Sequence, residues 1–142
     1  MSVRRVLPYV AAGLLLVGCE SSSSKKLPST RPVAVAPAIA RNSENGQSIR
    51  VAEAQELVIR LASNPTTGFS WKVAVIDGDH LQQVGEGIFE HADPQMVGAG
   101  GTQVFTFKPK KKGKTTLVLD YVRPWEQKPA ETTFTLNVMI DE

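Results

Sequence analysis

Apolar and polar residues alternate with a period of two along most of the chain from Ser48 to Ile140. The pattern is clearest near the end, where every second residue from Phe134 to Ile140 is a large apolar one. A period of two puts the apolar side chains on one face of a strand, whereas a helix repeats every 3.6 residues. The alternating runs are rich in β-branched and aromatic residues and are separated by Gly, Pro and Asn, as is typical of antiparallel strands with one buried face. The sequence therefore predicts an all-β domain.

About seven strands are expected, and seven short strands suit an immunoglobulin-like antiparallel β-sandwich. We place them near residues 48–52, 56–62, 69–76, 81–90, 102–108, 115–122 and 132–140. A closed barrel is the alternative. Cys19 is the one cysteine, so the sandwich has no internal disulfide. Trp71 falls in the middle of the third strand and is expected in the core.

The first 18 residues resemble a secretory signal. Arg4 and Arg5 precede an apolar run at 10–17 that is too short to span a bilayer. The run leads into Leu16-Val17-Gly18-Cys19, which resembles a bacterial lipobox, whose cysteine is lipidated and becomes the mature N-terminus. A cleaved signal with an incidental cysteine is the alternative.

We therefore expect an exported bacterial lipoprotein, held to a membrane of the cell envelope through a lipid on Cys19. Glu20 follows the cysteine where inner-membrane retention signals often carry Asp, which favours the outer membrane, facing the periplasm or the surface. Residues 19–45 are rich in Ser, Pro and Ala and predict a flexible tether. The folded domain is then expected to span residues 46–142.

Three connecting segments are not explained by strand packing alone. They are Asn64-Pro65-Thr66-Thr67-Gly68-Phe69, Pro94-Gln95-Met96-Val97-Gly98-Ala99-Gly100-Gly101 and Arg123-Pro124-Trp125-Glu126 with Gln127-Lys128-Pro129. The first predicts a stiff turn with a Thr pair, the second a glycine-rich loop with two apolar residues, and the third a tryptophan in polar surroundings. Because successive strands alternate in direction, all three should lie at one end of the sandwich, with the lysine-rich turn 108–114 at the other. Three loops on a rigid scaffold are a binding architecture.

Together these segments resemble the motifs of the chagasin family of cysteine peptidase inhibitors, over nearly the whole stretch from Ser48 to Ile140. The matching motifs are Asn-Pro-Thr-Thr-Gly-aromatic at 64–69, Gly-x-Gly-Gly at 98–101 and Arg-Pro-Trp at 123–125. The resemblance implies an immunoglobulin-like fold and a protein that is not an enzyme. It also implies reversible, non-covalent inhibition of papain-like cysteine peptidases, the partner class, by blocking the active-site cleft.

By the same resemblance, the Thr-Thr loop enters the cleft and the other two loops straddle it. The implied contact residues are Asn64, Pro65, Thr66, Thr67, Gly68, Phe69, Met96, Val97, Gly98, Ala99, Gly100, Gly101, Arg123, Pro124 and Trp125. Arg123 and Trp125 are expected to act as the cationic and aromatic anchors. The glycines of the second loop would let its backbone lie close to the peptidase. No cofactor is expected, and a monomer is the default.

Two other classes of function compete with inhibition. A metalloenzyme could use the two histidines, His80 and His91, with nearby carboxylates (Asp77, Asp79, Glu90 and Asp93), but their spacing matches no known ligand pattern. A non-inhibitory adhesion or glycan-binding module of the envelope is the second alternative, since β-sandwiches host many functions. The formal net charge of +2 is too small to indicate a nucleic-acid partner.

Overall fold

The computed structural model describes residue 13 and residues 35–142, and the second stretch forms eight strands. The elements are β1 (Ala38–Arg41), η1 (Asn42–Glu44), β2 (Ser48–Ala52), β3 (Leu57–Ser63), η2 (Pro65–Thr67), β4 (Ser70–Val75), β5 (Leu81–His91), β6 (Gly101–Pro109), β7 (Gly113–Val122) and β8 (Thr132–Asp141). The predicted signal segment, Cys19 and most of the predicted tether lie outside the described residues. Among the residues that are described, no helix is long and apolar enough to cross a membrane.

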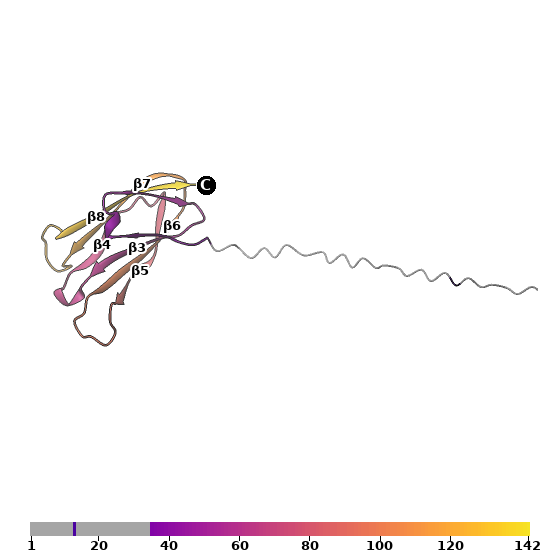
Figure 1. Ribbon diagram of the computed structural model, residues 1–142. Helices are drawn as coiled ribbons and strands as arrows, with labels where there is room; N and C mark the ends of the chain where they lie inside the picture. The colour runs from indigo at the N-terminus through magenta and orange to yellow at the C-terminus, as the bar shows by residue number, and fades with distance from the viewer. Residues whose placement is uncertain (1–12, 14–34) are drawn as a thin grey trace, which may run out of the picture. The chain divides into compact units, whose positions relative to one another are not determined.

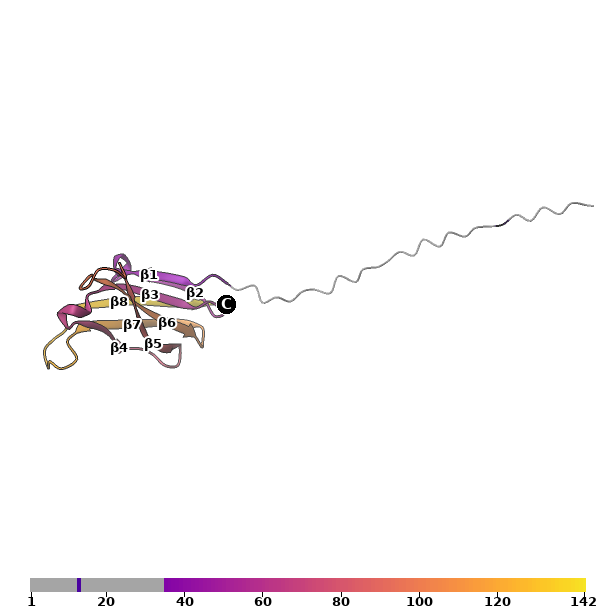
Figure 2. The ribbon, with the colours of Figure 1, turned by 90° about the horizontal axis from the view of Figure 1, so that it is seen from below.

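The strands form two four-stranded sheets, in the orders β1-β3-β6-β5 and β2-β8-β7-β4. Pairing is antiparallel except at the sheet edges formed by β1 and β2, which run parallel to β3 and β8. Figure 2 shows the two sheets lying over each other. The prediction of an immunoglobulin-like sandwich is confirmed, and the barrel alternative is wrong because β4 and β5 stay separate edges of different sheets.

The core lies between the sheets and follows the period-two pattern. Alternate residues of β3 are buried from Leu57 to Ser63, and β8 buries Phe134, Leu136, Val138 and Ile140 in the same way. These side chains meet Phe105 and Phe107 of β6 and the leucines of β7. Trp71 is 4% exposed, so its predicted place in the core is confirmed.

The folded domain begins earlier than the expected boundary at residue 46. Ala38–Arg41 pairs in parallel with the first half of β3, and Ala40 is fully buried in the core. Asn42 continues the contact, since its Oδ1 accepts a hydrogen bond of 2.8 Å from the Ala62 N–H. A four-residue strand with two alanines is too short and too weakly apolar to show a period, so this segment looked like tether. The last eight residues of the predicted tether are therefore part of the domain.

This extra strand gives a first prediction about stability. A protein that starts at Ser43 lacks β1, and loses its ladder to β3 and the burial of Ala40. Its free energy of unfolding should be lower by about 2 kcal/mol than that of residues 34–142, as urea denaturation can measure. Equal unfolding midpoints and slopes for the two proteins would show that β1 adds nothing.

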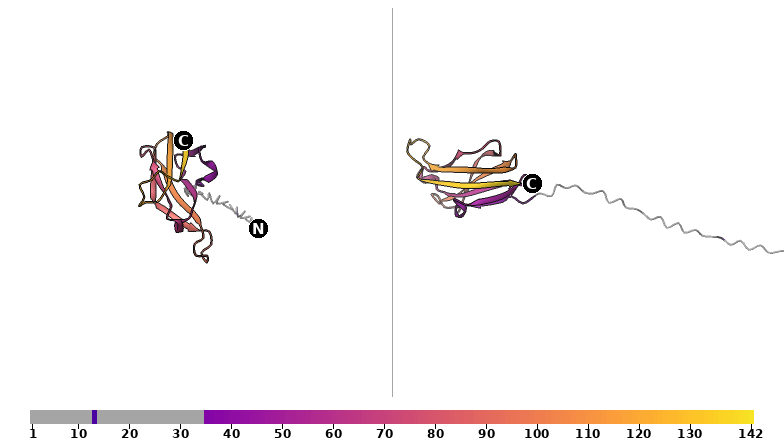
Figure 3. Two further views of the ribbon diagram at one scale, coloured as in Figure 1. Left: turned by 90° about the vertical axis from the view of Figure 1, so that its left-hand side faces the viewer. Right: turned by 90° about the horizontal axis from the view of Figure 1, so that it is seen from above.

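Three long connections define one end of the sandwich, the loop end. We name them loop 1 (64–69, between β3 and β4), loop 2 (92–100, between β5 and β6) and loop 3 (123–131, between β7 and β8). In Figure 1 they lie on the left and lower left of the domain, and the left panel of Figure 3 looks onto this end.

The strand register explains why the three loops meet there. The last residues of β3 and β5 both lie opposite Gly101, the first residue of β6. In the other sheet, Ser70 lies opposite Val122, and Tyr121 lies opposite Thr132. The lysine-rich turn joins β6 to β7 at the opposite end, which we call the far end. The expected placement of these four connections is thus confirmed.

Candidate functional site

Loop 1 is a short turn held by its own polar groups. Asn64 precedes the single turn of η2, and its Oδ1 accepts hydrogen bonds from the Thr66 N–H at 3.2 Å and the Thr66 hydroxyl at 2.6 Å. The Thr67 hydroxyl donates to the Asn64 carbonyl oxygen at 2.6 Å. Pro65 fixes its own φ at the first position of the turn. The Thr pair therefore serves first to rigidify the loop.

Gly68 ends this turn in a conformation that favours glycine, with φ at 81°. The indole of Trp125, from loop 3, lies directly against it. A Cβ at residue 68 would lie 2.5 Å from the Trp125 Cη2 atom, which is closer than carbon atoms pack. Gly68 therefore allows both the backbone turn of loop 1 and the position of Trp125.

Arg123 ties loop 3 to loop 1. Its Nε donates to the Thr67 carbonyl oxygen at 3.2 Å, its Nη1 donates to Glu126 at 3.1 Å, and its guanidinium lies 4.3 Å from the centre of the Phe69 ring. These contacts use two of the five N–H donors of the guanidinium. The structure thus gives Arg123 a bracing role inside the site, and its predicted role as a cationic anchor for a partner stays a prediction.

Glu126 strengthens this brace because it binds two cations. Its carboxylate accepts from Arg123 and pairs with Lys128 at 3.2 Å, and these bonds, Arg123 first, lower the pKa of Glu126. A carboxyl group whose pKa is depressed on folding contributes stability above its unfolded pKa, about 4.3, and loses it as the pH falls through the folded value. The brace should therefore stay intact down to about pH 5.

A pH series tests this directly. The wild type should exceed Glu126→Gln in free energy of unfolding by the same amount at pH 7 and at pH 5, since groups that both proteins share cancel in the difference. A difference that shrinks within that window would mean that Glu126 titrates there and that the brace fails earlier than expected.

Behind the loops, Tyr121 joins loop 1 to the sandwich. Its hydroxyl oxygen accepts a hydrogen bond of 3.1 Å from the Asn64 N–H. Its ring stacks on Phe69 at 5.2 Å and lies 4.9 Å from the Trp71 ring. Sequence analysis did not single out Tyr121, because its place in an alternating strand gave it no sign of a second role.

Loop 2 presents apolar side chains, and the strand that follows it, β6, begins with close backbone packing. Val97 is fully exposed and Met96 is 64% exposed. A Cβ at Gly101 would lie 2.2 Å from the Glu90 carbonyl oxygen and 2.6 Å from the Phe89 ring. The domain's own packing therefore requires a glycine at residue 101, where the sequence suggested close approach of a partner.

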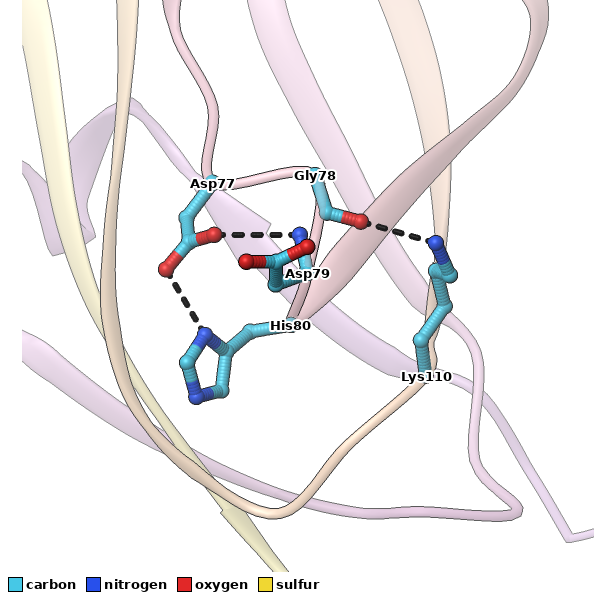
Figure 4. Close-up of polar contacts among 5 residues, drawn as sticks. All are labelled: Asp77, Gly78, Asp79, His80 and Lys110. Carbon is cyan, nitrogen blue, oxygen red and sulfur yellow. Dashed lines mark hydrogen bonds and ion pairs between the residues drawn. The ribbon is translucent and has the colours of Figure 1, made fainter.

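The histidines of the rival metal hypothesis lie at opposite ends of β5, so they do not converge. His80 pairs with Asp77 at 2.7 Å at the far end, in a turn where Asp77 also accepts from the Asp79 N–H (Figure 4). These two bonds, that from Asp79 first, lower the pKa of Asp77. Within residues 35–142 no three His, Cys, Asp or Glu side chains gather as metal ligands would.

The lysine-rich turn is likewise tied to its own domain. Lys110 donates from Nζ to the Gly78 carbonyl oxygen at 2.9 Å, and Lys112 pairs with Glu142 (Figure 4 shows Lys110). Two lysines of this turn therefore have structural contacts within the far end of the domain.

The fold and the site together define a binding protein of immunoglobulin-like architecture, with three braced loops at one end. The comparisons with known proteins assign the family. The model of the chagasin family of peptidase inhibitors (I42) matches residues 50–138, so the chain belongs to that family.

Two relatives and one solved structure agree with this assignment. Amoebiasin-1 of Entamoeba histolytica is 33% identical over 68% of this chain and 92% of its own length. Chagasin of Trypanosoma cruzi is 36% identical over 57% of this chain and 76% of its own length. The crystal structure of the cysteine protease inhibitor EhICP2 from Entamoeba histolytica superimposes with a TM-score of 0.65 at 27% identity, covering 75% of this chain and 96% of that one.

Proposed function

We propose that the domain inhibits papain-like cysteine peptidases reversibly, with loop 1 in the active-site cleft and loops 2 and 3 on either side. The observation that carries this proposal is the convergence of the three family motifs at one end of the sandwich, in loops that contact one another. The inhibitor needs no nucleophile or metal, because filling the cleft is enough to exclude substrate.

The distribution of apolar side chains supports this arrangement. Met96, Val97 and Trp125 are large exposed apolar residues, and all three come from loops 2 and 3. Loop 1, between them, exposes Pro65 and two threonines. Loop 1 has small polar side chains and is flanked by apolar ones. This arrangement suits a partner with a narrow polar cleft and apolar surfaces on either side of it. Aromatic anchors such as Trp125 contribute much of the binding energy at such interfaces.

The rigidity of the loops supports tight binding. The hydrogen bonds of Asn64 hold loop 1 in shape, and Arg123 and Gly68 hold it against loop 3. Loops that are already ordered lose little conformational entropy on binding, so an interface of modest area can still be tight.

Titration of papain with residues 34–142, followed by hydrolysis of a fluorogenic peptide, tests the function. This segment contains the whole core and all eight strands, so it is the part of the chain expected to fold. Stoichiometric inhibition at nanomolar concentration, reversed by dilution, is expected, and a trypsin-like serine peptidase should be unaffected. No inhibition at micromolar concentration by a domain with a β-sheet circular dichroism spectrum would reject the proposal and favour the adhesion alternative.

Two chemically blocked forms of papain test the mode of binding. Papain whose catalytic sulfur carries an S-methyl group should still bind the domain, because no bond to that sulfur is needed. Papain whose cleft is filled by a covalent peptidyl epoxide should not bind. Equal binding to both forms would place the contact outside the cleft.

We also propose that the protein is a bacterial lipoprotein anchored through Cys19. The lipobox-like run before Cys19 is the main support. The path of the chain is compatible with it, since Ala38, near the start of the domain, pairs with Leu57 at the far end of β3. A tether that leaves from the far end would let the loops face away from the membrane.

The anchor gives a localisation prediction. The full chain, expressed in a bacterium, should partition with membranes, and Cys19→Ala should move it to the soluble fraction or retain it as an uncleaved precursor. Mass spectrometry of the purified wild type should find a diacylglycerol on Cys19. A soluble wild type with an unmodified cysteine would reject the anchor without affecting the inhibitor proposal.

A further inference from the structure

Gln103 of β6 makes two hydrogen bonds to one residue of the opposite sheet, Trp71 of β4. Its Oε1 accepts from the Trp71 N–H at 2.8 Å, and its Nε2 donates to the Trp71 carbonyl oxygen at 3.1 Å. The indole of Trp71 also bonds to the sheet that contains Gln103, because its Nε1 donates to the Ala62 carbonyl oxygen of β3 at 2.9 Å. Three hydrogen bonds thus cross between the sheets beside the loops, where a sandwich interior is ordinarily apolar.

The chemistry of this contact calls for a side-chain amide. β4 is an edge strand, so part of its backbone has no neighbouring strand to bond with. A glutamine amide offers one donor and one acceptor group, as a peptide group does, and can satisfy an N–H and a C=O together. A partly buried backbone pair without partners is costly, so Gln103 replaces the missing strand at Trp71.

The position of this contact connects two of the loops. Gln103 lies two residues after the start of β6, which loop 2 precedes, and Trp71 lies two residues after Phe69, the last residue of loop 1. On its other side, loop 1 is held by Arg123 and Trp125 of loop 3. Loop 1 is therefore supported from both flanks, by loop 3 directly and by the loop 2 strand through Gln103.

We infer that Gln103 is a positioning residue, which fixes the exit of loop 1 relative to loop 2 and so sets the geometry that the target peptidase recognises. The effect on inhibition rests on the proposed function. The effect of Gln103 on the mobility of loop 1 can be measured without a peptidase. Gln103 lies behind the loops and need not touch the enzyme.

The variant Gln103→Met keeps the length of the side chain and removes both hydrogen bonds. Its inhibition constant for papain should rise about tenfold. The matched control is Gln82→Met, at an exposed position near the far end of β5, which should inhibit like the wild type. A second control, Val138→Ala, removes core volume from β8 and should lower the melting temperature without changing the inhibition constant.

Amide hydrogen exchange separates positioning from general destabilisation. In Gln103→Met, exchange of the Trp71 N–H and of the loop 1 amides of Thr67 and Gly68 should accelerate by a larger factor than exchange of the core amides of β8, which follows only the change in global stability. In Val138→Ala, exchange in the core should accelerate instead. Unchanged loop 1 exchange, or an inhibition constant within twofold of the wild type in a folded Gln103→Met protein, would overturn the inference.

The two proposals can fail separately. If the wild type does not inhibit papain but Gln103→Met still frees loop 1, the inhibitory function is wrong and the positioning of loop 1 stands. If the wild type inhibits and loop 1 exchange does not respond to Gln103→Met, the function stands and the role of Gln103 is wrong.

Discussion

Replacing Trp125 by alanine is expected to raise the inhibition constant for a papain-like peptidase about thirtyfold, equivalent to about 2 kcal/mol. Trp125 is 69% exposed, so a partner can cover much of its side chain. Its other face lies against Gly68, and Arg123 fixes the loop that carries it. A large ring that is exposed and already held in place gains apolar burial on binding with little loss of freedom.

The chain offers a matched control for this prediction in Ile88. Its side chain is 67% exposed, close to the value for Trp125, but it lies within the edge strand β5 and outside the three loops. Ile88→Ala should leave the inhibition constant unchanged. If the two variants lose affinity equally, exposed apolar area in general matters and Trp125 is no anchor. If neither loses affinity, the partner does not contact loop 3 through this ring.

Seven of the eight strands could be predicted from the sequence, most directly β3 and β8, because burial of one face imposes a period of two on the side chains. Phe134–Ile140 shows this directly, since its alternate residues are the buried ones. β1 could not be predicted in this way. It contributes one small buried side chain, Ala40, and is held by its backbone ladder to β3, which leaves no mark in the pattern of side chains.

The alternating direction of the strands was enough to predict where the three loops lie, but the sequence did not predict what each residue of the loops does. Arg123 was predicted only as an anchor for a partner, and the structure adds a brace, formed by its bonds to Thr67 and Glu126, that the sequence did not indicate. The braces at Tyr121 and Gln103 depend on which residues of the two sheets face each other, and sequence spacing carries no information on that. The motifs located the three loops, and only the structure showed which residues hold those loops in place.

Thr67→Asp is expected to weaken inhibition at least about a hundredfold, or by about 3 kcal/mol. The Thr67 hydroxyl donates to the Asn64 carbonyl oxygen at 2.6 Å, whereas an introduced carboxylate would have no proton to donate and would repel that oxygen. The side chain is exposed in the free domain, so the charge stays hydrated there and the fold should survive. In a complex that fills a cleft with loop 1, the same charge loses its water, and the nearest cation of this chain, Arg123, already bonds the Thr67 carbonyl oxygen and Glu126.

Two further variants separate the lost hydrogen bond from the added charge. Thr67→Ser keeps the donor and should inhibit nearly as well as the wild type, whereas Thr67→Val keeps the shape without the donor and should lose about tenfold. Inhibition should therefore weaken in the order Ser, Val, Asp. If Val and Asp lose equally, the damage lies in the conformation of loop 1 alone, and residue 67 is not desolvated by the peptidase. If Asp inhibits like the wild type, loop 1 does not enter the cleft, because a buried and unpaired carboxylate there could not be tolerated.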